Sequence, residues 1–185
     1  MGFRILTILM AVILGNFFMT DTKTAQAADF TITSNSFKNG ETLPNAHVYN
    51  HFGCTGGDIS PQLKWQGAPK DTKSFALIAH DPDAPRPEGW YHWIVINIPA
   101  NINSLKEGQQ INYPMIQMKN DFGRLKYGGA CPPKGHGVHH YNFTIYALDI
   151  AALLPSPNTT PVSMARQIKN KAIGSATITA VYERK

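Results

Sequence analysis

A strand that is apolar on both sides stands out in the pattern of this chain. Residues 90–98 read WYHWIVINI and place large groups on both alternating faces, which is typical of a strand lying between two packed layers. Segment 74–80 is a short apolar run, and 30–34 alternates apolar and polar residues. Further strands, rich in β-branched and aromatic residues, are expected at 141–148 and 176–182. The sequence therefore predicts a mainly β fold.

One helix is predicted near the C-terminal end. Thr160 can cap its first turn, Pro161 suits the first helical position, and Gly174 is expected to end it. Apolar residues recur between these ends at fourfold spacing, namely Met164, Ile168 and Ala172. No repeat or linker divides the rest of the chain, and a chain of 185 residues with 43% hydrophobic content can bury one good core. A single domain is expected over 28–185.

The first 27 residues have the features of a secretory signal peptide. Arg4 precedes an apolar stretch at 5–19 that is too short to span a bilayer comfortably, and Ala25-Gln26-Ala27 forms a small-x-small cleavage site. The mature chain would then begin at Ala28. We expect an exported protein, periplasmic or secreted, without a stable membrane anchor.

The two cysteines predict a disulfide. An even number of cysteines in an exported chain is the setting in which thiols are oxidised. A Cys54–Cys131 bond would close a loop of 78 residues (131 − 54 + 1) and stabilise the fold by at most about 4 kcal/mol. Two unrelated buried thiols are the alternative, whereas C-x-x-C redox or zinc chemistry is excluded by the spacing.

A charged strand exit follows the apolar run at 74–80. Asp81 and Asp83 lie two residues apart in the sequence DPDAP, whose prolines stiffen the backbone and remove donors. A cis peptide bond before Pro85 is the most plausible in this motif, but the sequence leaves it open. The two aspartates alone could simply be turn formers.

The chain returns as Trp90-Tyr91-His92-Trp93. Strand alternation places Trp90 and His92 on one face and the other two aromatic residues on the opposite face. A buried histidine needs partners for its ring nitrogens, and an aspartate from the neighbouring strand exit is a natural one. Taken alone, a histidine in the position of His92 is more often a satisfied core histidine than a ligand contact.

A second polar segment, YGGACPPKGHGVHHY, covers 127–141. The amides of Gly128 and Gly129 could converge on an anion. In the strand that follows, His139 and Tyr141 share a face while His140 points away.

The two segments would form a pocket if they lay side by side. The side chains that would meet are His92, His139 and Tyr141 above a floor of Asp81 and Asp83. Imidazolium, phenol and amide groups donate to a phosphate monoester or diester, and carboxylates hold the imidazole tautomers or receive an ammonium group. Because no nucleophile is present, the pattern favours binding over catalysis.

Both segments resemble the signature regions of the phosphatidylethanolamine-binding protein family, also called Raf kinase inhibitor-like proteins. The segment 54–65, CTGGDISPQLKW, resembles the bacterial branch, and the similarity covers nearly all of the mature chain. The resemblance implies a β-sandwich of antiparallel sheets with a few peripheral helices, and a small cavity for a phospholipid head group or another phosphorylated or anionic ligand. The family's ligand positions fall on Asp81, Asp83, Pro85, Trp90, His92, Cys131, Pro132, His139 and Tyr141.

Other classes of function are weighed against this one. A metal site could draw on His92, His136, His139, His140, Asp81 and Asp83, but strand alternation separates His139 from His140 and no H-E-x-x-H motif is present. A metal-dependent enzyme is therefore the weaker reading, and no metal or cofactor is expected. Scattered lysines and arginines disfavour nucleic acid. A secreted modulator or inhibitor that binds a protease or another partner through loops around the pocket stays open, as does a homodimer.

Overall fold

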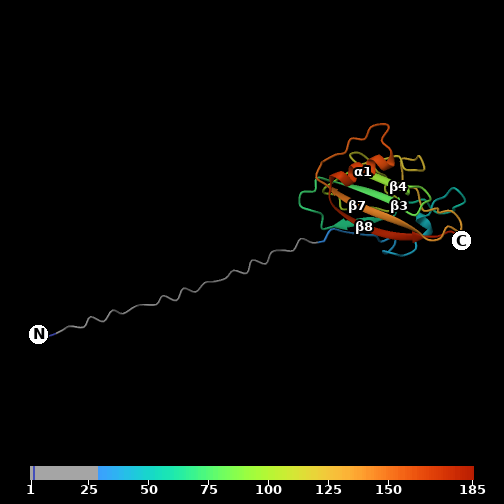
Figure 1. Ribbon diagram of the computed structural model, residues 1–185, viewed down its shortest axis with the longest axis horizontal. Coiled ribbons are helices and arrows are strands. Elements are labelled where there is room, and N and C mark those ends of the chain that lie inside the picture. The colour runs from blue at the N-terminus through green and yellow to red at the C-terminus, as the bar shows by residue number, and fades with distance from the viewer. Residues whose placement is uncertain (1, 3–28) are drawn as a thin grey trace.

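This computed structural model describes Gly2 and residues 29–185. The described residues form two antiparallel sheets and one α-helix, joined by loops (Figure 1). Apart from Gly2, the predicted signal peptide at 1–27 lies outside the described residues. None of the described helices has the length and apolar character needed to cross a bilayer. The mainly β prediction is confirmed.

The smaller sheet has three strands and the larger has five. The order in the smaller sheet is β1 (Thr31–Thr33), β2 (Leu63–Gln66) and β5 (Ser104–Leu105). The order in the larger sheet is β6 (Ile116–Gln117), β4 (Trp90–Pro99), β3 (Ser74–Asp81), β7 (His139–Leu148) and β8 (Ala172–Tyr182). The short strands β2, β5 and β6 were not predicted, because two to four residues carry too little periodicity to reveal a strand.

Strand β4 lies between two apolar layers, as its composition predicts. Trp93 and Val95 belong to the core shared with the smaller sheet, which contributes Leu63 and Trp65 among others. On the opposite side, residues such as Ile94 pack with the apolar stripe of helix α1 (Pro161–Lys171). A single-turn 3-10 helix, η1 (Asn45–His47), lies in the long loop before β2.

The helix begins where it was predicted but ends earlier. Thr160 caps it, its side chain accepting a hydrogen bond from the Ser163 amide at 3.1 Å. The helix stops at Lys171, and β8 follows at once. Gly174 is therefore a strand residue paired with Ala147 and not the stop signal. Pairing with the long strand β7 replaces the final turn of helix that the apolar spacing suggested.

A β-bulge at His92 changes the faces predicted for the WYHW segment. Ala79 pairs with Trp93 whereas His80 pairs with Tyr91, so β4 holds one extra residue at this point. Tyr91 consequently packs on the helix side and Trp93 in the core between the sheets. The prediction that these two share a face is wrong, because a bulge breaks strict alternation.

The predicted disulfide is confirmed. Cys54 and Cys131 are bonded, with 6.0 Å between their Cα atoms. The cis peptide bond of the described residues is Tyr113–Pro114, so the bond before Pro85, the favoured candidate in the sequence, is not cis.

Candidate ligand-binding cavity

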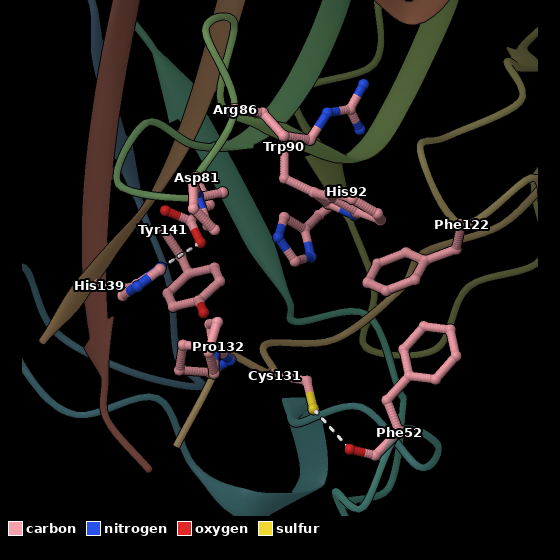
Figure 2. A pocket seen from close by; sticks show the side chains of 13 residues that line it. Phe52, Asp81, Arg86, Trp90, His92, Phe122, Cys131, Pro132, His139 and Tyr141 are labelled. Carbon is pink, nitrogen blue, oxygen red and sulfur yellow. Dashed lines mark hydrogen bonds and ion pairs between the residues drawn. The ribbon is translucent and has the colours of Figure 1, made fainter. Parts of the chain in front are cut away.

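A cavity of about 210 Å³ opens where the two polar segments meet, at the ends of β3, β4 and β7 (Figure 2). It collects eight of the nine residues to which the family resemblance assigns a ligand role; Asp83 is the exception. The eight are Asp81, Pro85, Trp90, His92, Cys131, Pro132, His139 and Tyr141. Segments far apart in the chain are thus brought together around one hollow, as the sequence predicts.

Two buried donors in the cavity wall lack a partner. Among the described residues, neither the indole Nε1 of Trp90 nor the hydroxyl of Tyr141 has a partner in regular hydrogen-bond geometry, although the carboxylate of Asp81 lies near the Tyr141 hydroxyl. Burial, and next the nearby charge of Asp81, raises the pKa of Tyr141, so its hydroxyl keeps its proton. Buried polar groups are normally satisfied, and two unpaired donors in one cavity indicate a place for an acceptor.

His92 is held at the back of the cavity by backbone contacts. Its Nδ1–H donates to the Gly128 carbonyl at 2.8 Å, and the Gly128 amide donates to the His92 carbonyl at 3.0 Å. The carboxylate expected as its partner is used elsewhere. Complete burial lowers the pKa of His92, which favours the neutral ring, and with Nδ1 donating this ring has a free lone pair on Nε2.

The buried carboxylate of Asp81 pairs with His139 instead. Its Oδ2 accepts from His139 Nδ1 at 2.7 Å, and its Oδ1 accepts from the Asp83 amide at 2.9 Å. The other ring nitrogen of His139 lies 2.8 Å from Nδ1 of His136, which continues the chain of contacts outward. Across the described residues, no group of three or more histidine, cysteine or acidic side chains is arranged to hold a metal ion.

Asp83 does not floor the cavity as the sequence suggests. Its Oδ2 accepts from both the amide and Nδ1 of His140, each at 2.8 Å, on the exposed side of β7. Partial burial alone would raise the pKa of Asp83, but the hydrogen bonds from His140 prevail and lower it. Residues two apart in an irregular strand exit need not share a direction, and here the turn carries Asp83 outward. His140 does point away from the cavity, as predicted.

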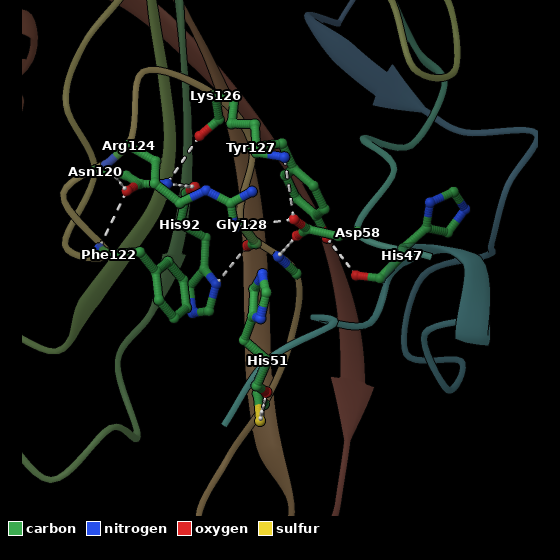
Figure 3. A network of polar contacts seen from close by, with 12 residues as sticks. His47, His51, Asp58, His92, Asn120, Phe122, Arg124, Lys126, Tyr127 and Gly128 are labelled. Carbon is green, nitrogen blue, oxygen red and sulfur yellow. Dashed lines mark hydrogen bonds and ion pairs between the residues drawn. The ribbon is translucent and has the colours of Figure 1, made fainter. Parts of the chain in front are cut away.

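The glycine pair has its amides occupied by the protein itself. The Gly129 amide donates to Oδ1 of Asp58 at 2.8 Å, and that of Gly128 is paired with His92. Asp58 is buried, with Arg124 at 3.1 Å and Lys126 at 3.4 Å from its Oδ2 (Figure 3). The loop binds an anion, as its composition suggests, but this anion is an internal carboxylate that fixes the cavity's rear wall.

Several cavity residues were not predicted from the sequence. Phe122 makes edge contacts with Trp90 and His92, with ring centroids 5.1 and 5.4 Å apart. The guanidinium of Arg86 lies 4.9 Å from the centre of the Trp90 ring, a cation–π arrangement, and its Nη1 lies 3.5 Å from Oδ1 of Asp121. The other unpredicted residues of the lining are Phe52, Ala84 and Pro133. A cation directly after DPDAP was a signal for Arg86, whereas the two phenylalanines lie in aperiodic loops.

Comparison with known proteins identifies a family model and several relatives that match this chain. The sequence model of the phosphatidylethanolamine-binding protein family matches residues 33–183. YbcL from Escherichia coli K12, a UPF0098 protein, is 44% identical over 168 residues, which cover 88% of this chain and 92% of YbcL. LppC from Mycobacterium tuberculosis H37Rv, whose name describes it as a lipoprotein, is 38% identical over 166 residues, covering 88% of this chain and 77% of LppC.

Solved structures show the same fold. The crystal structure of E. coli YbcL, described as a member of the mammalian PEBP family, superposes with a TM-score of 0.81 at 43% identity, over 85% of this chain and all of that one. The homologue CT736 from Chlamydia trachomatis gives a TM-score of 0.72 at 32% identity, over 84% of this chain and 98% of CT736.

Proposed function

The chain belongs to the phosphatidylethanolamine-binding protein family, and from this premise we propose that it is an exported, non-catalytic binding protein that holds phosphate or a phosphorylated small molecule in the cavity. The observation that carries the proposal is the pair of unpaired donors, Trp90 Nε1 and Tyr141 Oη, in one wall. Hydrogen bonds to a charged acceptor contribute more than neutral ones. An anion would satisfy both donors in a single step.

The surrounding charges support an anionic occupant. Arg86 lines the cavity and shares its charge between Asp121, at 3.5 Å, and any anion that enters. The carboxylate of Asp81 already accepts from His139 and from a backbone amide. His92 Nε2 can meet the anion in two ways. When the ring is neutral, Nε2 accepts a hydrogen bond from a P–OH group; when the ring takes up a proton on binding, Nε2 donates to a phosphate oxygen. A phosphodiester anion has no P–OH group to offer. Binding of a phosphodiester is therefore coupled to proton uptake by His92.

A binding role agrees with the chemistry of the lining. The residues that line the cavity include no serine or threonine, and Cys131 is held in a disulfide. Asp81 and His139 are paired with one another. The hydroxyl nearest to this pair is the phenol of Tyr141, and burial raises its pKa and keeps it protonated, which disfavours it as a nucleophile. The groups that line the cavity can bind and orient a phosphorylated ligand, but they do not include an activated nucleophile to attack it.

Export is supported by the disulfide and by a relative. Disulfides persist in oxidising compartments outside the cytosol, and LppC is described as a lipoprotein. Together with the leader-like sequence at 1–27, they favour export, and the small-x-small motif at 25–27 predicts cleavage before Ala28. Intact mass measurement on protein recovered from the cell envelope tests this, and a mass that retains residues 1–27 would contradict it.

Titration calorimetry with inorganic phosphate and with dimethyl phosphate tests the site. We expect Trp90→Phe to weaken binding roughly tenfold or more, because one hydrogen bond to a charged group contributes about 1.5–3 kcal/mol. The matched control is Trp65→Phe, since Trp65 also buries an unpaired Nε1 but lies in the core between the sheets. Binding of dimethyl phosphate requires a proton on His92, and burial lowers the pKa of this ring in the empty protein. The affinity for dimethyl phosphate should therefore rise as the pH falls below about 6.5, the ordinary histidine value.

Two results would overturn the proposal. One is a wild-type protein that binds neither anion. The other is Trp90→Phe and Trp65→Phe variants that bind phosphate with equal affinity, which would move the site away from this cavity.

A further inference from the structure

Phe52 holds an unusual conformation at the mouth of the cavity. Its side chain is 73% exposed, yet its backbone has φ of 56°, in the left-handed region that bulky side chains rarely adopt. An aromatic residue in this region is strained, and strain of this kind persists where the surroundings enforce it. The exposed ring gains little burial in return, so core packing does not explain it.

Three constraints fix the segment that carries this ring. The guanidinium of Arg184 donates to the Phe52 carbonyl at 3.4 Å and to the Gly53 carbonyl at 3.0 Å. The next residue, Cys54, is bonded to Cys131 in the cavity wall. Arg184 also donates to the carbonyl of Pro132, another wall residue, at 3.2 Å. Residues 52–54 are thus attached to the cavity wall both through Arg184 and through the disulfide.

The Phe52 ring extends an aromatic wall that leads to the unpaired donors (Figure 2). Its centroid lies 6.2 Å from that of Phe122 and 5.7 Å from that of Tyr49. Phe122 in turn contacts Trp90, whose Nε1 is one of the two donors. A ligand whose anion reached Trp90 and Tyr141 would present its adjoining group to this aromatic surface.

Other exposed apolar residues do not share this setting. Tyr113 and Leu154 are more exposed than Phe52, at 93% and 89%, but neither lines the cavity. Scattered apolar residues on a surface are normal and need no function. Phe52 differs because a strained backbone, an arginine clamp and a disulfide combine to aim it at one place.

We propose that Phe52 is a specificity-determining residue, which contacts an aromatic group that the ligand carries next to its phosphate. This inference rests on the proposed function, because it takes the cavity to be the anion site. An aromatic group is favoured over an alkyl chain, since rings gain from edge and offset contacts with Phe52 and Phe122 beyond the area that they bury. The ligand class is therefore an aryl phosphate.

Phenyl phosphate, butyl phosphate and methyl phosphate form the test, because all three are monoesters of phosphate. Titration calorimetry on the wild-type protein should give an affinity for phenyl phosphate about tenfold higher than for methyl phosphate, the effect of burying one ring face. Butyl phosphate should fall between them. The key variant is Phe52→Asn, because asparagine tolerates the left-handed backbone that Phe52 adopts and lacks the ring.

The variant should bind phenyl and methyl phosphate with nearly equal affinity, its affinity for methyl phosphate being that of the wild type. Tyr113→Asn serves as the matched control and should keep the wild-type preference. If methyl phosphate binds and phenyl phosphate binds no more tightly, or if Phe52→Asn keeps the preference, the role of Phe52 is refuted while the anion site stands. If the wild-type protein binds none of the esters, both proposals fall.

Discussion

Removing the Tyr141 hydroxyl should stabilise the empty protein while weakening its binding of phosphate. The hydroxyl is buried without a partner among the described residues, and an unsatisfied buried polar group costs about 1–3 kcal/mol. Tyr141→Phe removes this group and leaves the ring in place. We expect a gain of about 1 kcal/mol in the free energy of unfolding, or a rise in Tm of about 2–4 °C for a domain of this size.

Tyr127→Phe is the matched control because the same atom is removed from a satisfied site. The Tyr127 hydroxyl donates to the His47 carbonyl at 2.8 Å. That carbonyl would keep only a long contact of 3.4 Å from the Ala130 amide. We therefore expect a loss of about 1 kcal/mol, so the two variants should differ by about 2 kcal/mol and have opposite signs.

Urea unfolding followed by far-UV circular dichroism measures both variants, and calorimetry with inorganic phosphate measures their binding. Tyr141→Phe should bind phosphate roughly tenfold or more weakly, and Tyr127→Phe should bind it like the wild type. The reasoning is refuted if Tyr141→Phe destabilises the protein as much as Tyr127→Phe does. That result would mean that the Tyr141 hydroxyl has a partner in the empty protein, for which the nearby Asp81 is the candidate.

Three further perturbations have defined outcomes. Because burial lowers the pKa of His92, the unfolded chain binds a proton that the folded chain excludes, and the free energy of unfolding should fall by up to about 1.4 kcal/mol per pH unit below about pH 6.5. Urea unfolding of His92→Gln should show a smaller decrease, and identical pH profiles of the variant and the wild type would contradict this. Replacing Cys54 and Cys131 together by alanine should lower the free energy of unfolding by about 2–4 kcal/mol, and a wild-type protein unaffected by reducing agent would argue against the bond's contribution. Asp58→Asn should destabilise by about 2 kcal/mol or more in the same assay, because it discharges a buried carboxylate that two cations and the Gly129 amide hold; a neutral effect would show that this network is dispensable.

The strands of the larger sheet were predictable because their sequences are long and consistent. β3, β4 and β7 have eight to ten residues with buried apolar side chains, which is enough for the pattern to be unambiguous. The meeting of Asp81 and His139 followed from placing both at strand ends. The disulfide followed from counting cysteines in a chain with an export-like leader.

The details that the sequence does not reveal depend on competition between distant groups. Gly129 offers its amide to an anion, but only the fold shows that Asp58, 71 positions earlier, occupies it. Asp81 and Asp83 look equivalent in the motif, and their partners on β7 send them to opposite sides. The bulge at His92 reflects pairing with β3, which no local pattern of β4 records.

That extra residue in β4 has a consequence for protein engineering. Upstream of it Trp90 faces the cavity, and downstream of it Trp93 faces the core, although strict alternation would put them on opposite sides. A chimera or loop graft that deletes one position here would bring the indole of Trp90 out of the hollow and bring the phenol of Tyr91 in. Crossover points for recombined variants should therefore lie outside residues 90–93.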